Sequence, residues 1–355
     1  MIRKCEAPNM KYLSILIILG LIFVGPFTSC EATLSPTDSS MIGGNNMEND
    51  LKQASTNTQE SQYNSIKSGV FFIGGEYNGT QYINQSMVHR LGFENAHTPI
   101  VMLPGLGLSA YIYTSTPDGR NGWTADFAQA GFDTYAIDTS NLAISGLEIA
   151  LFGTENQPRL STWGENKIWR TWGFGEKPNE PYAVTQYPVE YIEQLYASFS
   201  PQISRVTGTR GSAADLTEVA NIISLLEKTG SAVLMVHSMG GVTGVEVVKQ
   251  RPDLVKALVV IEPVGSPVDE ELLREKFVKI PFLAVYGDFI ESRGQTGRHE
   301  ASKKTARILN EIGGVGEVIT MTDLGVNGNT HLMMQDKNSS DISNLIIEWL
   351  NKYLR

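Results

Sequence analysis

The stretch Ser231-Ala232-Val233-Leu234-Met235-Val236-His237-Ser238-Met239-Gly240-Gly241-Val242 decides the fold of this chain. Its first part, Ala232 to Val236, is a continuous apolar run, which is typical of a strand covered on both faces. From Val242 to Gln250 the valines fall on or near one face of a helix. The stretch therefore predicts a strand, a sharp turn that carries Ser238, and a helix.

A serine on such a turn is suited to nucleophilic catalysis. The nucleophile elbow has the pattern Gly-x-Ser-x-Gly, because small residues make room where backbone packs against backbone. Gly240 supplies the downstream glycine, whereas Val236 stands at the upstream position. A serine hydroxyl needs a base to remove its proton, so a histidine and an orienting acid are required elsewhere. An ordinary tight connection between strand and helix is the alternative interpretation of Ser238.

Two backbone N–H groups are candidate donors to an oxyanion. The N–H of Met239 lies at the predicted start of the helix, where the helix dipole favours negative charge. A second apolar strand, Ile100 to Leu103, is followed by Pro104-Gly105-Leu106-Gly107. A glycine-rich loop in this position can present N–H groups to an anion, and Leu106 is the predicted second donor. A plain turn is the alternative.

Predicted strands and helices alternate through the rest of the chain. Strands are expected at 70–73, 82–91, 100–103, 134–137, 232–236, 257–261, 281–286 and 317–321, and helices at 124–130, 214–228, 243–250, 302–312 and 341–353. This alternation predicts an α/β fold in which helices flank both faces of a mostly parallel sheet. Active residues in such sheets lie beyond the carboxyl ends of the strands.

Between about 141 and 201 the alternation is lost and aromatic residues gather. They are Trp163, Trp169, Trp172, Phe174, Tyr182, Tyr187 and Tyr191. An aromatic-rich insertion between regular units fits a cap over an apolar pocket. A satellite core without substrate contact is the alternative interpretation.

The base and the acid should also follow strands. Of the five histidines, only His331 lies in a loop between the final strand and the last helix. Glu262 and Asp288 each come just after a strand that follows Ser238, and both would project at the same edge of the sheet. Either could instead cap a helix or form a turn, so the residue pattern leaves the choice of acid open.

The motifs together resemble the α/β-hydrolases, whose chain order is Ser, acid, His. The closer resemblance is to exported bacterial esterases whose acid is a glutamate after the sixth strand of the sheet. The matching segments run in order across most of residues 70–355: Thr116-Pro117-Asp118-Gly119-Arg120 with Gly122-Trp123, His237-Ser238 with Gly240, Ile261-Glu262-Pro263-Val264-Gly265, Tyr286-Gly287-Asp288, and Gly328-Asn329-Thr330-His331-Leu332-Met333-Met334-Gln335-Asp336.

The resemblance implies a role for each candidate. Ser238 would be the nucleophile, His331 the base and Glu262 the acid, and the N–H groups of Leu106 and Met239 would hold the oxyanion. The convention of the wider fold, with the acid after the seventh strand, favours Asp288 instead. Two departures concern the oxyanion loop: Pro104 stands where many relatives have a histidine, and Leu106-Gly107 stands where some have a cysteine pair.

The N-terminal residues have a different character. Tyr12 to Val24 is an apolar run behind a basic start, which predicts a signal peptide over 1–29, with Met10 as an alternative start to Met1. The run is short for a membrane span. Thr28-Ser29 before Cys30 resembles a bacterial lipoprotein cleavage site, so Cys30 is a candidate for lipid attachment; ordinary signal cleavage is the alternative. The polar stretch 30–68 predicts a flexible linker, and 69–355 the hydrolase domain.

Composition narrows the class of protein. The chain has 28 basic and 38 acidic side chains and a net charge of -10. This balance argues against nucleic acid or an anionic membrane as the main partner. Without residues 1–29 at most one cysteine remains, which excludes an internal disulfide. No His, Cys and carboxylate cluster has ligand spacing, so neither a metal nor another cofactor is expected.

The sequence thus predicts an exported enzyme, either a cell-envelope lipoprotein or a secreted or periplasmic protein. It would hydrolyse small-molecule carboxylic esters through an acyl-enzyme on Ser238. An amidase, thioesterase or lactonase on the same triad is one alternative. An inactive, surface-tethered binding protein with the same fold is the other.

Overall fold

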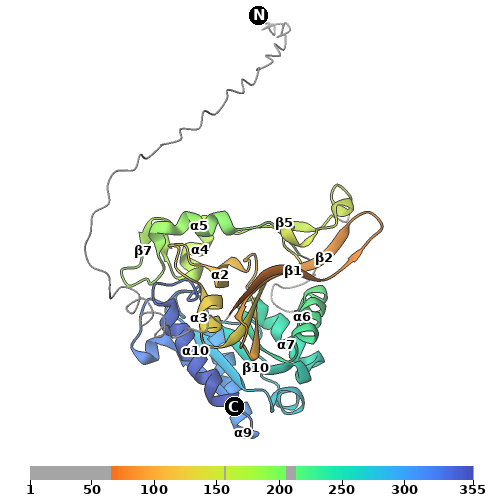
Figure 1. Ribbon diagram of the computed structural model, residues 1–355. Helices are drawn as coiled ribbons and strands as arrows, with labels where there is room; N and C mark the ends of the chain where they lie inside the picture. Colours follow the sequence, from red (N-terminus) through yellow and green to blue (C-terminus); the bar gives the residue numbers. More distant parts are fainter. Residues whose placement is uncertain (1–64, 156, 205–212, 355) are drawn as a thin grey trace, which may run out of the picture. The chain divides into compact units, whose positions relative to one another are not determined.

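An eight-stranded sheet is the centre of the fold (Figure 1). The computed structural model describes residues 65–155, 157–204 and 213–354. In chain order the strands are β1 (Ile66–Tyr77), β2 (Tyr82–Phe93), β3 (Thr98–Leu103), β4 (Phe132–Ile137), β9 (Ala232–His237), β10 (Val255–Ile261), β11 (Phe282–Tyr286) and β12 (Gly316–Thr320). Their order across the sheet is β1-β2-β4-β3-β9-β10-β11-β12. The pairs β1–β2 and β2–β4 are antiparallel and the others are parallel, which confirms the predicted mostly parallel sheet.

The apolar runs of the central strands explain this arrangement. Every residue of β9 is buried. Successive side chains of a strand point to opposite faces, so Val233 and Met235 join one hydrophobic cluster while Leu234 and Val236 join the other. A strand that contributes to two cores must be apolar throughout, as the sequence indicated.

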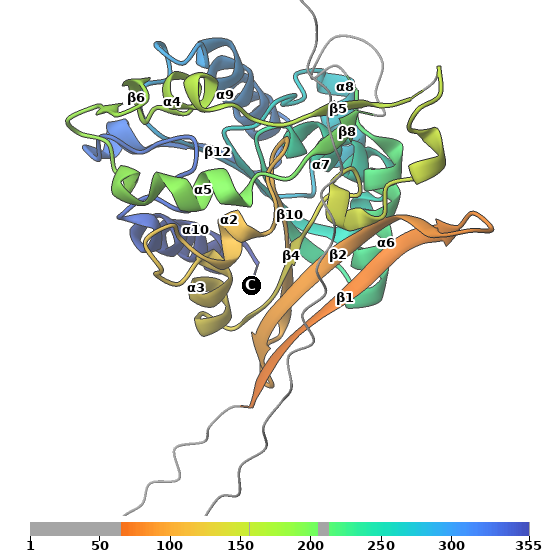
Figure 2. The same ribbon diagram turned by 90° about the horizontal axis from the view of Figure 1, so that it is seen from above.

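Helices cover both faces of the sheet, as predicted. The first cluster is closed by α3 (Trp123–Gln129) and α10 (Ser339–Tyr353), and the second by α6 (Leu216–Thr229), α7 (Gly240–Gln250) and α9 (Thr296–Glu311). Figure 2 shows α3 and α10 on one side of the strands and α6 and α7 on the other. Shorter elements complete this part of the fold: α2 (Tyr111–Thr114), η4 (Pro252–Leu254), α8 (Glu270–Leu272), η5 (Leu273–Phe277) and η6 (Met321–Leu324).

Two elements are longer than their sequence patterns indicate. The edge strand β1 begins at Ile66, inside the stretch expected to be linker, and pairs with β2 from Ile66↔Phe93 to Tyr77↔Tyr82. It is mostly exposed, and main-chain pairing alone extends it. Helix α9 begins at Thr296, whereas the sequence pattern predicted 302; the pattern did not indicate the first turns because they are polar and lack an apolar repeat.

The insertion between β4 and α6 contains short elements that the sequence pattern did not predict. They are η1 (Ala143–Ser145), η2 (Ile149–Leu151), β5 (Arg159–Ser161), α4 (Glu165–Trp172), β6 (Gly175–Lys177), β7 (Glu180–Pro181), η3 (Val189–Tyr191), α5 (Ile192–Ser198) and β8 (Gln202–Ser204). Trp169, Trp172, Phe174 and Tyr187 are buried in the first cluster. Tyr191, by contrast, is 49% exposed.

The predicted signal peptide, Cys30 and the linker up to residue 64 lie outside the described residues. Within the described ranges, none of the helices has both the length and the apolar character needed to cross a bilayer.

Candidate active site

Ser238 occupies a strained turn at the carboxyl end of a central strand. It lies between β9 and α7 with a φ of 50°, in the left-handed region that non-glycine residues rarely adopt. Its N–H donates to the carbonyl of Ile261 at 3.0 Å, and its own carbonyl accepts from Gly241 at 3.0 Å and Val264 at 2.8 Å. These main-chain bonds hold the turn. The residue itself is partly exposed.

Small residues around the turn allow this close packing. A Cβ at Gly240 would lie 3.1 Å from the carbonyl oxygen of Pro104. The departure at Val236 is accommodated from the other side, because a Cβ at Gly244 would lie only 3.0 Å from Val236 Cγ1. The room that the usual pattern obtains from an upstream glycine is therefore provided here by a glycine one helical turn downstream.

The loop after β3 packs directly on Ser238. A Cβ at Gly105 would come within 2.8 Å of Ser238 Cβ and 2.9 Å of His237 Nδ1. The two predicted oxyanion donors follow these contacting residues, Leu106 after Gly105 and Met239 after Ser238. Among the described residues, neither of their N–H groups donates a hydrogen bond. Within the part of the chain that the structure describes, both N–H groups are therefore available to an acceptor on a substrate.

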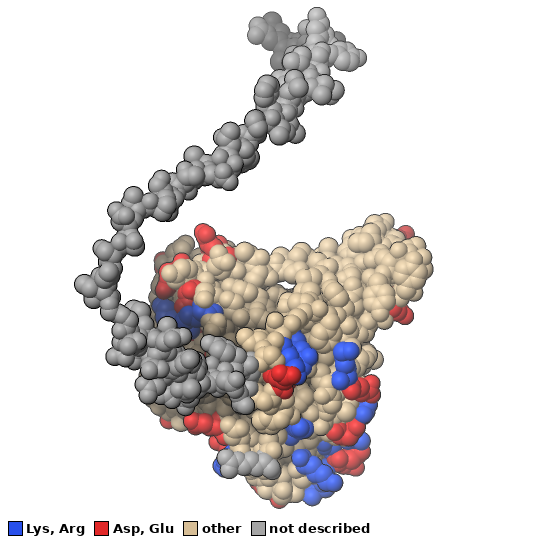
Figure 3. Space-filling model, in the orientation of Figure 1, with Lys and Arg blue, Asp and Glu red and all other residues tan. Residues whose placement is uncertain are grey.

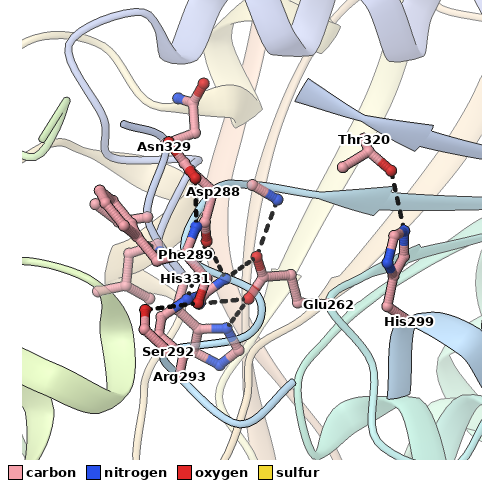
Figure 4. A network of polar contacts seen from close by, with 12 residues as sticks. Glu262, Asp288, Phe289, Ser292, Arg293, His299, Thr320, Asn329 and His331 are labelled. Carbon is pink, nitrogen blue, oxygen red and sulfur yellow. Dashed lines mark hydrogen bonds and ion pairs between the residues drawn. The ribbon is translucent and has the colours of Figure 1, made fainter. Parts of the chain in front are cut away.

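Of the two candidate acids, the structure brings Glu262 to His331 (Figure 4). Glu262 directly follows β10 with a φ of 43°, and its side chain is fully buried. Its Oε2 accepts from His331 Nδ1 at 2.6 Å, and its Oε1 accepts from the N–H of Gly287 at 2.9 Å. The bond from His331 Nδ1 orients the imidazole and leaves its Nε2 as the nitrogen that can take a proton.

Asp288 binds main-chain groups of the loop that carries His331, rather than the His331 imidazole. Its Oδ2 accepts from the N–H of Gly328 at 2.8 Å, and its Oδ1 accepts from the N–H of Phe289 at 2.5 Å. The N–H of Asp288 donates to the carbonyl of Asn329 at 2.8 Å. The residue thus ties the end of β11 to the 328–331 loop.

Arg293 completes the surroundings of Glu262, although no pattern in the sequence singles it out as a site residue. Its Nη1 donates to Glu262 Oε2 at 2.7 Å and its Nη2 to Oε1 at 2.6 Å. Burial by itself raises the pKa of the Glu262 carboxyl, but the Arg293 charge and His331 more than offset this, so the pKa lies well below its usual range. A buried carboxylate requires a counter-charge. A buried acid in this position therefore also implies a nearby cation, although the sequence does not say which one.

Two further contacts position His331. Its N–H donates to the carbonyl of Trp172 at 2.8 Å, and its carbonyl accepts from His237 Nε2 at 2.9 Å. Burial lowers the pKa of His331, and the raising effect of Glu262 is countered by the Arg293 charge. The imidazole is therefore held in the neutral form that can act as a base.

The segment Thr116 to Arg120, one of those that carry the resemblance to the esterases, binds the loop that carries His331. The Arg120 guanidinium donates to the carbonyls of Gln335 at 3.3 Å and Asp336 at 3.0 Å. The Asp336 carboxylate accepts from the N–H and Oγ1 of Thr330, each at 2.7 Å. Burial raises the pKa of Asp336 to about 7. The contacts of Arg120 join residues more than 200 positions apart, and no periodic sequence pattern predicts them.

The insertion contacts both loops of the site. A Cβ at Gly328 would lie 1.6 Å from the carbonyl oxygen of Val184, and the N–H of Gln186 donates to the Gly328 carbonyl at 2.8 Å. On the other loop, Trp163 Nε1 donates to the Leu106 carbonyl. The insertion is therefore joined to the site's framework. Among the described residues no three His, Cys, Asp or Glu side chains gather as metal ligands would.

The chain is similar to a known family and to individual hydrolytic proteins. Residues 98–330 match the family model described as the alpha/beta hydrolase fold. A probable secreted lipase, phiG, from a fungal species (strain ATCC 74256) is 23% identical over 352 residues, covering 80% of this chain and 90% of that protein. The atomic-resolution structure of a novel bacterial esterase is similar with a TM-score of 0.74 and 29% identity, covering 81% of this chain and 96% of that one.

Proposed function

Because the chain belongs to the α/β-hydrolase fold family, we propose that it is a serine esterase that hydrolyses carboxylic esters of small molecules. The observation that carries the proposal is the buried bond of 2.6 Å between His331 Nδ1 and Glu262 Oε2, at the edge of the sheet where Ser238 occupies its strained turn. The 29% identity to a bacterial esterase over 81% of the chain supports ester substrates.

The proposed reaction begins with attack of Ser238 Oγ on the ester carbonyl carbon, while His331 Nε2 accepts the hydroxyl proton. The N–H groups of Leu106 and Met239 stabilise the oxyanion of the tetrahedral intermediate. The imidazolium then gives its proton to the leaving alcohol, which yields the acyl-enzyme. Water, deprotonated by His331, then attacks the acyl carbon. The bond from that carbon to Ser238 Oγ breaks, His331 returns the proton to Oγ, and the carboxylic acid is released. Throughout, Glu262 fixes the ring and stabilises its charged form.

An assay of purified protein on nitrophenyl esters of rising chain length, beside Ser238→Ala, tests this function. We expect turnover by the native chain and a loss of roughly 10⁶-fold in kcat in the variant, by analogy with serine nucleophiles in general. Parallel amide, thioester and lactone substrates test the alternative chemistries on the same residues. Hydrolysis that is undiminished in a folded Ser238→Ala protein would refute the proposal, and inactivity of the native chain on every substrate would favour the binding-protein alternative.

We also propose that the chain is exported and anchored through a lipid on Cys30. The apolar run Tyr12 to Val24 and the Thr28-Ser29-Cys30 sequence support this, and the similarity to a probable secreted lipase is compatible with export. The mature protein should partition into detergent, and Cys30→Ala should release it. A Cys30→Ala protein that still partitions with detergent would contradict the anchor without touching the hydrolase proposal.

A further inference from the structure

We propose that Arg293 is a positioning residue for this reaction, and that its guanidinium sets the pH at which His331 can act as a base by keeping Glu262 ionised. The inference rests on the proposed function, because it assigns work to the same Glu262–His331 pair. Figure 4 shows the Arg293 guanidinium beside the Glu262 carboxylate, which also accepts the hydrogen bond from the His331 imidazole.

Arg293 and Glu262 form a buried, bidentate ion pair. The side chains of Arg293 and Glu262 are both 0% exposed. Arg293 binds the two carboxylate oxygens with both terminal nitrogens, at 2.7 and 2.6 Å, so the plane of the carboxylate is fixed as well as its position. Oε2 receives both Arg293 Nη1 and His331 Nδ1. Any rotation of the carboxylate away from the arginine would therefore also disturb the imidazole.

The arginine is itself held in place. Its Nε and Nη2 donate to the carbonyl of Asp288 at 3.1 and 2.8 Å. Its N–H donates to the carbonyl of Phe289 at 2.9 Å. These bonds to the end of β11 leave the side chain little freedom to follow a moving carboxylate. Its fork geometry and permanent charge are properties that lysine reproduces only in part.

The charge has a defined effect on the pair. A carboxylate removed from water holds a proton tightly unless a cation faces it. Arg293 opposes protonation of Glu262, and across Glu262 it also opposes protonation of His331. The two groups titrate as one coupled system, so removing the arginine must raise the proton affinity of the pair whichever member takes the proton.

The other titratable and charged groups around the pair do not replace this contact. They are His237 on β9, Tyr286 on β11, Arg298 and His299 on α9, and Asp288 and Asp336 in the loops that follow β11 and His331. Among the described residues, Arg293 is the one permanent cation within ion-pair distance of Glu262, since the His331 imidazole is held in its neutral form. Its removal is therefore the most direct change of charge at this site.

The test compares the pH dependence of kcat/KM for native protein, Arg293→Gln, Arg293→Lys and Arg307→Gln on one neutral nitrophenyl ester. In Arg293→Gln the acid limb should move to higher pH by about one to two units, the size that Coulomb's law gives at an effective dielectric constant of about 20. Arg293→Lys keeps the charge, so its midpoint should stay within about half a unit while kcat falls. Arg307, exposed on α9 and paired with Glu311, is the matched control and should change neither.

A folded Arg293→Gln protein with an unmoved acid limb would overturn the inference, because a purely structural arginine would lower kcat without shifting the profile. If thermal melts show that Arg293→Gln does not fold, the native profile decides. Its acid limb should then fall below about 6.5, the ordinary pKa of histidine, and a higher midpoint would contradict the inference. Full activity in a folded Glu262→Gln protein would also overturn the inference, because the carboxylate that Arg293 faces would then play no part in the reaction. Absence of any covalent adduct on Ser238 when the native protein is treated with a fluorophosphonate would instead refute the proposed function itself.

Discussion

Three non-glycine residues with positive φ follow three neighbouring parallel strands. Ser238 comes after β9 with 50°, Glu262 after β10 with 43°, and Phe289 after β11 with 60°. Such backbone costs about 1–3 kcal/mol per residue and persists only where the surroundings enforce it. Here the sheet edge enforces it, since the N–H of Ser238 donates to the last residue of β10 and the N–H of Glu262 to Val285 of β11. The strained backbone therefore lies at the edge of the sheet where the reaction is proposed to take place.

The choice between the two acids gives a prediction at this scale. Replacing Glu262 with Gln should lower kcat by roughly 10⁴-fold, because the amide no longer fixes the tautomer or stabilises the imidazolium. Asp288→Asn should cost about 10-fold in kcat and lower the melting temperature, because its carboxylate holds the N–H of Gly328. Both are measured as kcat with thermal melts beside them. Near-normal turnover in folded Glu262→Gln, with collapse in Asp288→Asn, would reverse the assignment.

Some of these residues could be predicted from the sequence because strands dictate their place. Ser238, Glu262 and Asp288 each lie within two residues of the end of an apolar run, and the carboxyl ends of parallel strands meet at one edge. Arg293 could not be found in this way. It lies in an irregular segment between β11 and α9, where no periodicity tells a buried arginine from an exposed one.

At the scale of elements, the aromatic insertion divides into two parts. Trp172 is 2% exposed, packs with its ring centroid 6.2 Å from that of His331, and supplies the carbonyl that holds the His331 N–H. Trp163 is only partly buried and contacts the Leu106 loop. The first tryptophan belongs to the framework of the site. The second is the better candidate for contact with substrate.

The corresponding prediction pairs Trp172→Ala with Trp163→Ala. Truncating the buried Trp172 leaves a cavity that costs about 3–5 kcal/mol, so the melting temperature should drop and kcat should fall alike for all esters. Trp163→Ala should alter the ratio of kcat/KM between large and small esters with a smaller change in melting temperature. The reverse pattern, with Trp172→Ala shifting only the ratio, would place Trp172 in the substrate pocket.

The elements differ in how far the sequence predicts them. The central strands match their predicted ranges within a few residues, because burial on both faces demands an unbroken apolar run. β1 does not, since an exposed edge strand needs only main-chain partners. The clamp of Arg120 on the 335–336 carbonyls also could not be predicted, because it joins residues more than 200 positions apart.

At the scale of the whole molecule, the charges on the surface differ from those in the candidate active site in their exposure to solvent. Figure 3 shows Lys and Arg interspersed with Asp and Glu on the face in view. Exposed pairs such as Arg274–Glu270 are screened by solvent and contribute little. The Arg293–Glu262 pair has no solvent exposure, so its field acts on His331 with little screening. We therefore expect the active pH range to depend on buried residues rather than on the net charge of -10.

The central claim is that Ser238 carries the acyl group during turnover. The most direct measurement is intact-protein and peptide mass spectrometry after reaction with a fluorophosphonate, and with a slowly deacylated ester quenched in acid. We predict one adduct per chain, located on Ser238 and absent from Ser238→Ala. An adduct on another residue, or one that persists in Ser238→Ala, would contradict it.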